Sequence, residues 1–438
     1  MSDYMFMLDS HLNSGQNKAL SKVANAAEEA GLNVFLTGGA MRDMMGGLPI
    51  RDLDFTVEGG TVKFAKSIAQ NANAEVLSID DARKSVELRF PENITVSISP
   101  AHQERYPRPG AKPQVQPSTI HEDLRCRDFT VNAIALSLGK GSRGLLLDPT
   151  NGLGDLRNKE LRAVGSHTLF DDPARIFRLI RLKIRLSFAV DERTQLQYQN
   201  ALEADIPSKI SQEALHRELM QIAQEPLAGE ILQALDEEKL LGVISPALTG
   251  SKLNLVGFQK LQRLQLALGP ESALAREARR LFFYLLFEKL TPRERSQVAK
   301  SLGLDKATLD AIGKLEARAA KVEKELAAFK FSRPSSLYWL LSKVPGELVL
   351  FLLMRSKQRL VLDRLKNYYQ KYLPVAHEVS ETDILEQGIE LGTPKFAKVR
   401  TELITARLDA RPKKIAVEEP PPPAPVGPGR RSQSILNR

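Results

Sequence analysis

Two aspartates stand one residue apart in the stretch GGLPIRDLDFTVEGG, at positions 52 and 54. The stretch reads as a β-strand, and residues two apart on a strand point to the same face. Asp52 and Asp54 would therefore project together, and two close carboxylates repel each other unless a cation lies between them. Oxygen ligands of this kind suit Mg²⁺, which also keeps room for phosphate oxygens. The pair is compatible with a magnesium site that supports catalysis, but by itself an exposed pair of aspartates without metal is the commoner arrangement.

A glycine turn lies shortly before this pair, in VFLTGGAMRDMMGG. Gly38 and Gly39 fall between a predicted strand and a predicted helix, where glycine lets a phosphate approach the backbone closely. The start of the helix offers free N–H groups to an anion. With the carboxylate pair, the turn predicts a nucleoside triphosphate site, and Arg42 on the helix would neutralise the phosphates. An ordinary tight turn and a surface arginine are the alternatives.

The two motifs together resemble a known family. GGAMRD followed by RDLDFTVEG is similar to the opening motif of class II tRNA nucleotidyltransferases (CCA-adding enzymes) and bacterial poly(A) polymerases, within the DNA polymerase beta-like nucleotidyltransferase superfamily. Four later stretches resemble the family's further motifs in the same order: EDLRCRDFTVNAIAL, LLDPTNGLGDLRNKELRAV, FDDPARIFRLIRL and ISQEALHREL. The resemblance covers roughly residues 30 to 245. It implies catalytic and metal-binding roles for Asp52 and Asp54, and nucleotide-binding roles for Gly38, Gly39, Arg42, Arg127, Asp128, Asn132, Asp172, Arg175 and Arg178.

The stretch FDDPARIFR suggests how a base would be chosen. Asp172, Arg175 and Arg178 are spaced three apart and would share one helix face. An ionised aspartate only accepts hydrogen bonds and an arginine only donates them. Cytosine and adenine both offer an amino group beside a ring-nitrogen acceptor, whereas guanine and uracil present a carbonyl beside an N–H. One Asp/Arg pair can thus accept C and A without a nucleic-acid template. The alternative is a helix start, with aspartate at the N-cap and proline at N1.

The chain departs from the family pattern at four positions. Ser97 stands where many relatives carry an acid, and His102 stands where they carry an arginine. Cys126 replaces the first arginine of the RRDFT motif, and Ala214 replaces an arginine of the fifth motif. Asp52, Asp54 and substrate phosphates can still hold Mg²⁺ without a third carboxylate. We therefore expect an active enzyme, with a catalytically weakened RNA-binding relative as the alternative.

Composition sets the wider expectations. The chain has 438 residues, 42% of them hydrophobic, and a formal net charge of +9, which suits a polyanionic partner such as nucleic acid. The single cysteine excludes an internal disulfide and a multi-cysteine zinc site, and a reducing, cytoplasmic location is the simple interpretation. We find neither a signal peptide nor an apolar run long enough to cross a bilayer, so no membrane association is expected.

The periodicity of apolar residues changes along the chain. Short strands alternate with helices over the first third, and RYPRPGAKPQVQPS reads as a proline-rich loop. Helical periodicity takes over from about residue 172, with no convincing strand after about residue 190. The predicted fold is an α+β head with a mixed sheet, of the polymerase beta-like nucleotidyltransferase class, followed by an all-α neck, body and tail. The expected segments are a head at 1–150, a neck at 151–245, an RNA-binding body and tail at 246–412, and a disordered proline-rich end at 413–438.

These features lead to one expected function. A template-independent nucleotidyltransferase would add C, A or both from CTP and ATP to the 3′ end of tRNA, with Mg²⁺ and release of pyrophosphate. The basic helical part would hold the acceptor and T arms of the tRNA. A poly(A) polymerase and a partial CC- or A-adding enzyme remain as alternatives, and the oligomeric state is left open.

Overall fold

The computed structural model describes residues 3–410, apart from 270–273, 275–276, 329–330, 381, 386–387 and 391. The chain divides into two compact units, Met1–Glu325 with Pro345–Gln358, and Leu326–Val344 with Arg359–Arg438. The disordered end expected at 413–438 lies outside the described residues. All of the residues that carry the predicted site fall in the first unit.

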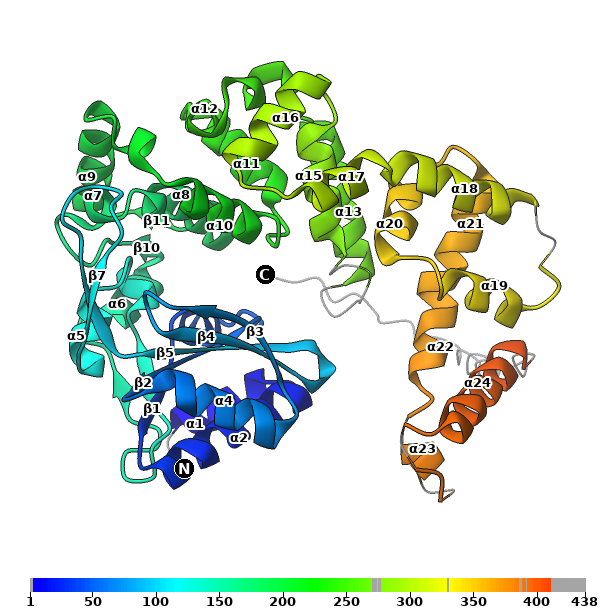
Figure 1. Ribbon diagram of the computed structural model, residues 1–438, viewed down its shortest axis with the longest axis horizontal. Coiled ribbons are helices and arrows are strands. Elements are labelled where there is room, and N and C mark those ends of the chain that lie inside the picture. Colours follow the sequence, from blue (N-terminus) through cyan, green and yellow to red (C-terminus); the bar gives the residue numbers. More distant parts are fainter. Residues whose placement is uncertain are drawn as a thin grey trace, which may run out of the picture. The chain divides into compact units, whose positions relative to one another are not determined.

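A seven-stranded mixed sheet forms the centre of the first part of the chain (Figure 1). Its strand order is β3-β4-β5-β2-β1-β8-β9, and only β2 and β5 run parallel among these neighbours. The strands are β1 (Asn33–Thr37), β2 (Leu53–Glu58), β3 (Glu75–Asp80), β4 (Ser85–Phe90), β5 (Ile94–Pro100), β8 (Ala135–Ser137) and β9 (Leu146–Leu147). The predicted mixed sheet is confirmed.

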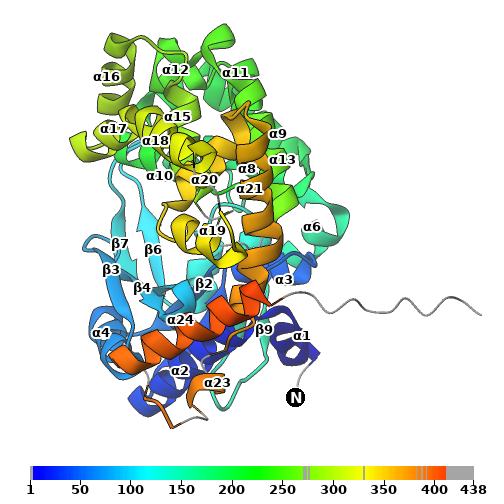
Figure 2. The ribbon, with the colours of Figure 1, turned by 90° about the vertical axis from the view of Figure 1, so that its right-hand side faces the viewer.

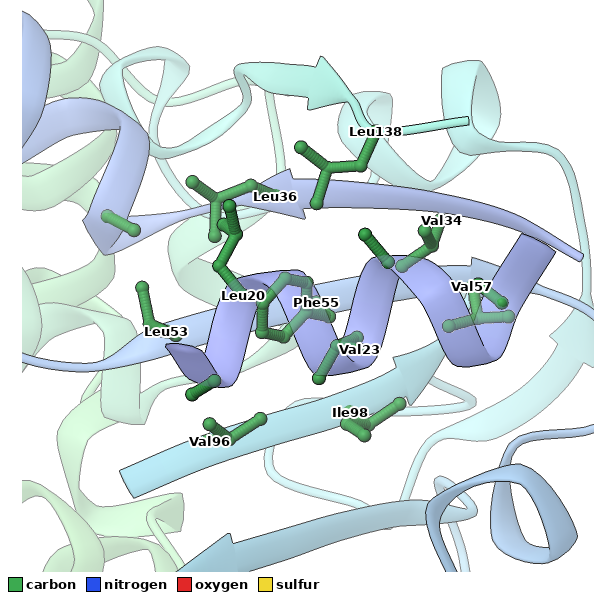
Figure 3. Close-up of a cluster of buried hydrophobic side chains, with 14 of the residues drawn as sticks. Leu20, Val23, Val34, Leu36, Leu53, Phe55, Val57, Val96, Ile98 and Leu138 are labelled. Atoms are coloured by element: carbon green, nitrogen blue, oxygen red, sulfur yellow. The ribbon is translucent and has the colours of Figure 1, made fainter. Parts of the chain in front are cut away.

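The two faces of this sheet have different chemistry. On the first face, alternate residues of three strands are apolar and pack against α2 (Ser14–Ala30), where Leu20 and Val23 contact them (Figure 3). The strand residues on this face are Val34, Leu36, Leu53, Phe55, Val57, Val96 and Ile98. Each large apolar side chain buried in this way contributes roughly 1.5–3 kcal/mol. Because side chains alternate along a strand, the residues between them, including Asp54, point to the opposite face.

Helices cover the sheet on both sides. Helices α1 (Asp3–His11), α2 and α4 (Thr61–Ala72) lie with the apolar face, as both ribbon views show (Figures 1 and 2). Helix α3 (Gly39–Met45) follows β1 directly. Helices α8 (Ala174–Leu186) and α10 (Gln212–Ile222) lie on the other side of the sheet (Figure 1). The polar face of the sheet is therefore directed toward the basic motif of α8.

The segment between β5 and β8 differs in part from the expectation. Residues 105–118 were expected to form a loop, but Gln114–Pro117 is a strand, β7, that pairs antiparallel with β6 (His102–Arg105). The prolines lie mainly in the turn between the two strands, while Val115 faces Glu104 in the ladder. Ladder pairing with a neighbouring strand is a non-local effect, which the local proline content does not reveal. Helix α5 (Ile120–Arg125) and the 3₁₀ turn Thr130–Asn132 follow.

The rest of the described chain is predominantly helical, as predicted. Beyond β9, the strands among the described residues are β10 (Glu160–Leu161) and β11 (Ala189–Val190), and no strand follows Val190 there. The helices up to residue 245 are α6 (Gly152–Asn158), α7 (Thr168–Asp171), α8, α9 (Glu192–Glu203), α10, α11 (Ala228–Glu237) and α12 (Leu241–Ile244). The later helices are α13 (Leu255–Leu268), α15 (Ala278–Phe287), α16 (Pro292–Ser301), α17 (Lys306–Gly313), α18 (Leu315–Ala328), α19 (Pro334–Leu341), α20 (Gly346–Arg355), α21 (Arg359–Asn367), α22 (Leu373–His377), α23 (Thr382–Leu385) and α24 (Pro394–Asp409).

None of the helices described above is by itself both long and apolar enough to cross a membrane. One bent pair, α19 with α20, meets the two requirements only when both helices are taken together.

Candidate active site

A cavity of about 440 Å³ lies between the polar face of the sheet and the helices α8 and α10. Eight arginines and six acidic residues line it, so the cavity suits a highly charged anion together with a cation. The predicted site residues that line it are Gly38, Gly39, Arg42, Asp52, Asp54, Arg127, Asp128, Asn132, Arg175 and Arg178. Asp172, which the structure also describes, lies outside this lining.

The glycine turn closes tightly on the carboxylate pair. Gly38 has φ +67°, a conformation that favours glycine, and precedes α3 as its N-cap residue. A Cβ at this position would lie 3.3 Å from Asp54 Oδ2 and 3.4 Å from Arg127 Nη1. Any larger residue would therefore crowd both the carboxylate and the guanidinium group. The turn brings backbone, negative charge and positive charge together at one end of the cavity.

Asp54 is held in an unfavourable environment for a charged group. Burial and the neighbouring Asp52 raise the pKa of Asp54 to about 6, although Arg127 and Arg42 act in the opposite direction. A divalent cation would relieve this repulsion, so the donor set fits such an ion. Among the described residues no group of three or more His, Cys, Asp or Glu side chains gathers around a common point. A cation here would therefore take its remaining ligands from phosphate oxygens and water.

The departures from the family pattern fall close to the same place. Ser97 lies directly opposite Asp54 in the parallel register of β2 and β5 and lines the cavity. His102 and Cys126 also line it, whereas Ala214 is buried on α10 outside the lining. The position at which relatives carry an acid is thus next to Asp54, and this chain places a neutral hydroxyl there.

Two arginines and an asparagine form the wall beside Asp54. Arg127 donates to Asp123 at 2.9 Å and to the Thr56 hydroxyl at 3.0 Å, which directs its guanidinium group along the polar face of the sheet. Arg42 donates to the side-chain oxygen Oδ1 of Asn132 at 2.7 Å. Each arginine is held by a defined partner, so the wall is ordered before any ligand binds.

Asp128 has the opposite electrostatic setting from Asp54. It accepts hydrogen bonds from Arg178 at 2.8 Å and from the Asn132 amide at 3.0 Å. Burial alone would raise the pKa of Asp128, but Arg178, Arg175 and these hydrogen bonds outweigh burial and lower it. Arg178 also donates to Glu218 on α10, so it joins the second, fourth and fifth motifs. Arg127 and Asp128 are both in ion pairs within the protein, and both also line the cavity.

Helix α8 presents a row of arginines to the cavity. Arg175, Arg178, Arg181 and Arg185 all line it, because residues three and four apart share one helix face. The apolar residues between them, such as Phe177 and Ile180, are buried on the other side. This row of arginines therefore belongs to the cavity, whereas Lys183 of the same helix is exposed and lies outside the lining.

Arg175 has a donor without a partner. Its side chain is 9% exposed and lies 3.8 Å from Asp172 Oδ2 and 4.0 Å from Glu104 Oε2. The Nε atom of Arg175 is buried and has no hydrogen-bond partner in the described part of the chain. An unsatisfied donor of this kind costs ~1–3 kcal/mol unless a ligand accepts its hydrogen bond.

The start of α8 differs from the expected helix start by one position. Pro173 occupies the N-cap position, and Asp172 precedes it in an extended conformation. One carboxylate oxygen of Asp172, Oδ1, accepts the Ala174 N–H at 3.2 Å, and the other faces Arg175. Asp172 thus supports the helix start while remaining beside Arg175.

Several cavity residues escaped the sequence analysis: Arg51, Arg83, Glu104, Arg185, Gln221 and Gln224. Arg185 continues the spacing of the other α8 arginines, so this signal was available. Glu104 accepts from Arg83 at 2.6 Å and from Tyr106 at 2.5 Å, contacts that arise from the β6–β7 hairpin and its neighbours. No short sequence pattern indicates hydrogen bonds between segments that are distant in the chain, such as the one between Arg83 and Glu104.

Comparison with known proteins agrees with the placement of these motifs in the first part of the chain. Residues 34–162 match the family model of the poly A polymerase head domain. These residues form such a head domain. It holds the glycine turn, the carboxylate pair and the motif of Arg127, Asp128 and Asn132, and the family resemblance seen in the motifs is confirmed.

Relatives extend the similarity beyond the head domain. The chain is 24% identical over 416 residues to an A-adding tRNA nucleotidyltransferase of Geobacter sulfurreducens, covering 93% of this chain and 47% of the relative. It is 34% identical over 203 residues to a CC-adding tRNA nucleotidyltransferase of Deinococcus radiodurans, covering 46% of this chain and 52% of the relative. The chain thus spans about half the length of these curated relatives.

A solved structure shares the fold. The Thermotoga maritima CCA-adding enzyme complexed with tRNA is 21% identical, with a TM-score of 0.51 over 93% of this chain and 95% of that one. The predicted α+β head followed by a helical region is confirmed.

Proposed function

We propose that this protein is a template-independent RNA nucleotidyltransferase that adds C, A or both from CTP or ATP to the 3′ end of tRNA and releases pyrophosphate. The observation that carries the proposal is the cavity in which Asp52 and Asp54 meet the Gly38 turn, the Arg127 wall and the α8 arginines. Relatives that bear the names of A-adding and CC-adding tRNA nucleotidyltransferases support it.

Asp52 and Asp54 would hold Mg²⁺ at the β2 end of the cavity. The raised pKa of Asp54 supports this assignment, because a bound cation offsets the repulsion between the two carboxylates. The chemistry that a bound Mg²⁺ would supply there is activation of the RNA hydroxyl and stabilisation of the negative charge on pyrophosphate. The protein contributes two fixed carboxylates that set where the RNA hydroxyl and the α-phosphate meet.

The triphosphate would lie along the glycine turn and the arginine wall. Gly38 and Gly39 allow close approach to the backbone, and Arg42 and Arg127 offer guanidinium donors to phosphate oxygens. Asp128 and Asn132 would hold the ribose side, since Asp128 orients the Asn132 amide at 3.0 Å. The six residues named in this paragraph all line the same cavity.

Base choice would depend on Asp172 and Arg175. Arg175 offers its unpartnered Nε to a ring nitrogen, and Asp172 lies beside it as an acceptor for the amino group of cytosine or adenine. Arg178, fixed by Asp128 and Glu218, would hold this arrangement in place. Guanine and uracil would leave both side chains without suitable partners, which disfavours them strongly.

The partner would be tRNA, held at its acceptor and T arms by the basic helical part of the chain. The net charge of +9 supports a polyanionic partner. The Thermotoga maritima structure of similar fold is a complex with tRNA. A cytoplasmic location is part of the proposal and rests on the single cysteine, Cys126.

A partial activity is the second candidate. The names of the A-adding and CC-adding relatives suggest an enzyme that completes only one part of the CCA end. A poly(A) polymerase, suggested by the name of the head-domain family, differs in taking general RNA 3′ ends. The three activities differ in their products rather than in their catalytic residues.

The test is incorporation on one tRNA transcript that ends at the discriminator base, at C or at CC. Each labelled nucleoside triphosphate is supplied with Mg²⁺, and products are resolved to one nucleotide. Addition of C, C and then A with a stop establishes CCA addition, while CC alone or A alone onto CC establishes a partial enzyme. A long A ladder on any RNA establishes a poly(A) polymerase. Binding of tRNA without any product contradicts the proposed function.

A further inference from the structure

His102 on β6 lies between two buried carboxylates at the edge of the cavity. Its ring atom Nε2 is 3.5 Å from Glu104 Oε1, and its Nδ1 is 3.6 Å from Asp123 Oδ2. The side chains of His102, Glu104 and Asp123 are 15%, 11% and 6% exposed, so water and salt screen these contacts only weakly. An imidazole in such a place is either a neutral packing group or a cation, and its hydrogen bonds decide between the two.

The hydrogen bonds of the ring favour the cation. Nδ1 lies 2.8 Å from the carbonyl oxygen of Pro100, and because a carbonyl only accepts hydrogen bonds, Nδ1 carries a proton. In a neutral ring the lone pair of Nε2 would then face the carboxylate of Glu104, and a proton on Nε2 replaces this repulsion by attraction. Burial acts to lower the pKa of His102, but Glu104, the Pro100 carbonyl and Asp123 outweigh burial and raise it.

Asp123 connects His102 to the arginine wall of the active site. One oxygen of Asp123, Oδ2, accepts the backbone N–H of His102 at 3.3 Å and faces its ring. The other oxygen, Oδ1, accepts from Arg127 Nε at 2.9 Å and lies 2.8 Å from Nη2 of the same arginine. A charged His102 offsets part of the negative charge of Asp123, which leaves more of the positive charge of Arg127 available to a phosphate group.

The other charged and titratable groups around His102 contact Glu104. Arg83 from the β3–β4 turn donates to Glu104 at 2.6 Å, the hydroxyl of Tyr106 after β6 donates at 2.5 Å, and Arg175 of α8 lies 4.0 Å away. Both arginines keep their charge throughout the pH range in which a histidine titrates. Burial and Glu104 raise the pKa of Tyr106, so its hydroxyl stays neutral in that range. Among the side chains of this cluster, His102 is therefore the one that changes charge near neutral pH.

We infer that His102, in its protonated form, is a positioning residue for the incoming nucleotide: through Asp123 it holds Arg127 toward the triphosphate. The inference rests on the proposed function, in which Arg127 binds a phosphate oxygen. Many relatives carry an arginine at this position, and an arginine keeps its charge at every pH. The histidine of this chain makes nucleotide binding weaken as pH rises.

The test measures KM for the incorporated nucleotide at saturating tRNA and Mg²⁺, between about pH 6 and about pH 9. Because the pKa of His102 is raised in the folded protein, its charge is fully present in the ordinary histidine range and is lost only above it. KM for the nucleotide in the wild type should then rise about fivefold, as for the loss of one partly buried charge contact.

His102→Arg supplies the comparison, because it keeps a positive charge across the whole range. Its KM for the nucleotide should stay at the low value, while kcat differs from that of the wild type by less than about twofold at each pH. Titration of Asp54 affects both proteins alike, so the ratio of their KM values reports on His102 alone. A merely structural role of His102 would leave this ratio independent of pH.

His102→Gln covers the case in which an arginine does not fit at this position. Glutamine can still donate a hydrogen bond to the Pro100 carbonyl but has no charge at any pH, so its KM should equal the high-pH value of the wild type throughout. His121→Gln is the matched control, because His121 is exposed on α5 and lies outside the cavity lining. It should leave the pH profile of the wild type unchanged.

The outcomes separate the two claims. No incorporation by the wild-type protein at any pH contradicts the proposed function itself. Incorporation with a KM for the nucleotide that does not rise with pH in the wild type, or with a KM ratio to His102→Arg that stays constant, contradicts only the role of His102. A pH-dependent difference in KM for tRNA in place of nucleotide also overturns the inference.

Discussion

At the β2 end of the cavity, burial and Asp52 raise the pKa of Asp54 to about 6, whereas near α8 the pKa of Asp128 is lowered. Burial disfavours the charged form of both carboxyl groups, so burial does not explain the difference. Their neighbours do: Asp128 accepts from Arg178 at 2.8 Å, while the largest charge effect on Asp54 comes from another carboxylate, Asp52. The charge of Asp128 is balanced within the protein, whereas Arg127 and Arg42 compensate the charge of Asp54 only in part.

This contrast separates a structural aspartate from one suited to bind a cation. Asp128 is satisfied by the protein and in return fixes Arg178 and Asn132. Asp54 has a charge that the protein compensates only in part, and a divalent cation would complete the balance. The same residue type therefore takes different roles within one cavity.

The largest expected effect is a loss of nucleotide incorporation on changing Asp52, beside Asp54. Asp52→Ala should reduce nucleotide incorporation by more than ~10³-fold, because loss of a metal ligand removes electrostatic stabilisation of the transition state. tRNA binding, measured by filter retention, should stay within a few-fold. Equal loss of binding and incorporation would indicate a folding defect and would contradict a specific role of Asp52.

A change at Asp128, where charges are balanced, should lower the stability of the fold. Asp128→Asn removes one of the two buried carboxylates that pair with Arg178, the other being Glu218, so the free energy of unfolding should fall by ~1–3 kcal/mol. The effect should be full above the ordinary pKa of an aspartate and should diminish as pH falls from there toward the lowered pKa of folded Asp128, where the carboxylate becomes protonated. Urea denaturation measures the change. Asp81→Asn is the control: its parent side chain is 94% exposed, and the same measurement should find it neutral.

Base choice should change without loss of the fold. Arg175→Ala removes the donor with the unpartnered Nε, so discrimination of C and A against G and U should fall by ~10–100-fold. Competition between labelled nucleotides measures the ratio. Arg157→Ala, an exposed arginine on α6 outside the cavity, should leave the ratio unchanged. Unaltered discrimination in Arg175→Ala would remove Arg175 from base selection.

The smallest expected effect is a pH dependence of the Mg²⁺ concentration that gives half-maximal rate. Asp54 becomes protonated as pH falls through about 6, so its proton competes with the cation. The Mg²⁺ concentration for half-maximal rate should rise about fourfold between pH 8 and pH 5.5, from a single competing proton. Asp128 adds nothing in this range, because its lowered pKa keeps it ionised. A constant Mg²⁺ requirement would contradict the raised pKa of Asp54.

Much of the head domain followed from local patterns in the sequence. Alternation of apolar and polar residues in VELRF and FTV predicted strands, and it also set which face carries Asp54. The α8 arginines were readable because helical spacing brings them to one face. These features depend on residues within a few positions of one another.

Other features depend on contacts between distant segments. Strand β7 exists because it pairs with β6, despite the prolines around it. Glu225 lies 174 positions from Arg51, and no motif links them. The position of Ser97 opposite Asp54 follows from the parallel register of β2 and β5, which the sequence alone does not specify.

The unfolding free energy of Asp54→Asn, with and without Mg²⁺, tests the central claim most directly. The pKa of Asp54 is raised in the folded state, so its charge destabilises the fold increasingly as pH rises from its ordinary value toward about 6. At pH 8 without divalent cation, Asp54→Asn should therefore be more stable than the wild type by ~1–3 kcal/mol. Mg²⁺ should stabilise the wild type and leave the variant nearly unchanged. A destabilised Asp54→Asn, or equal responses of both proteins to Mg²⁺, would contradict a cation-binding role for Asp54.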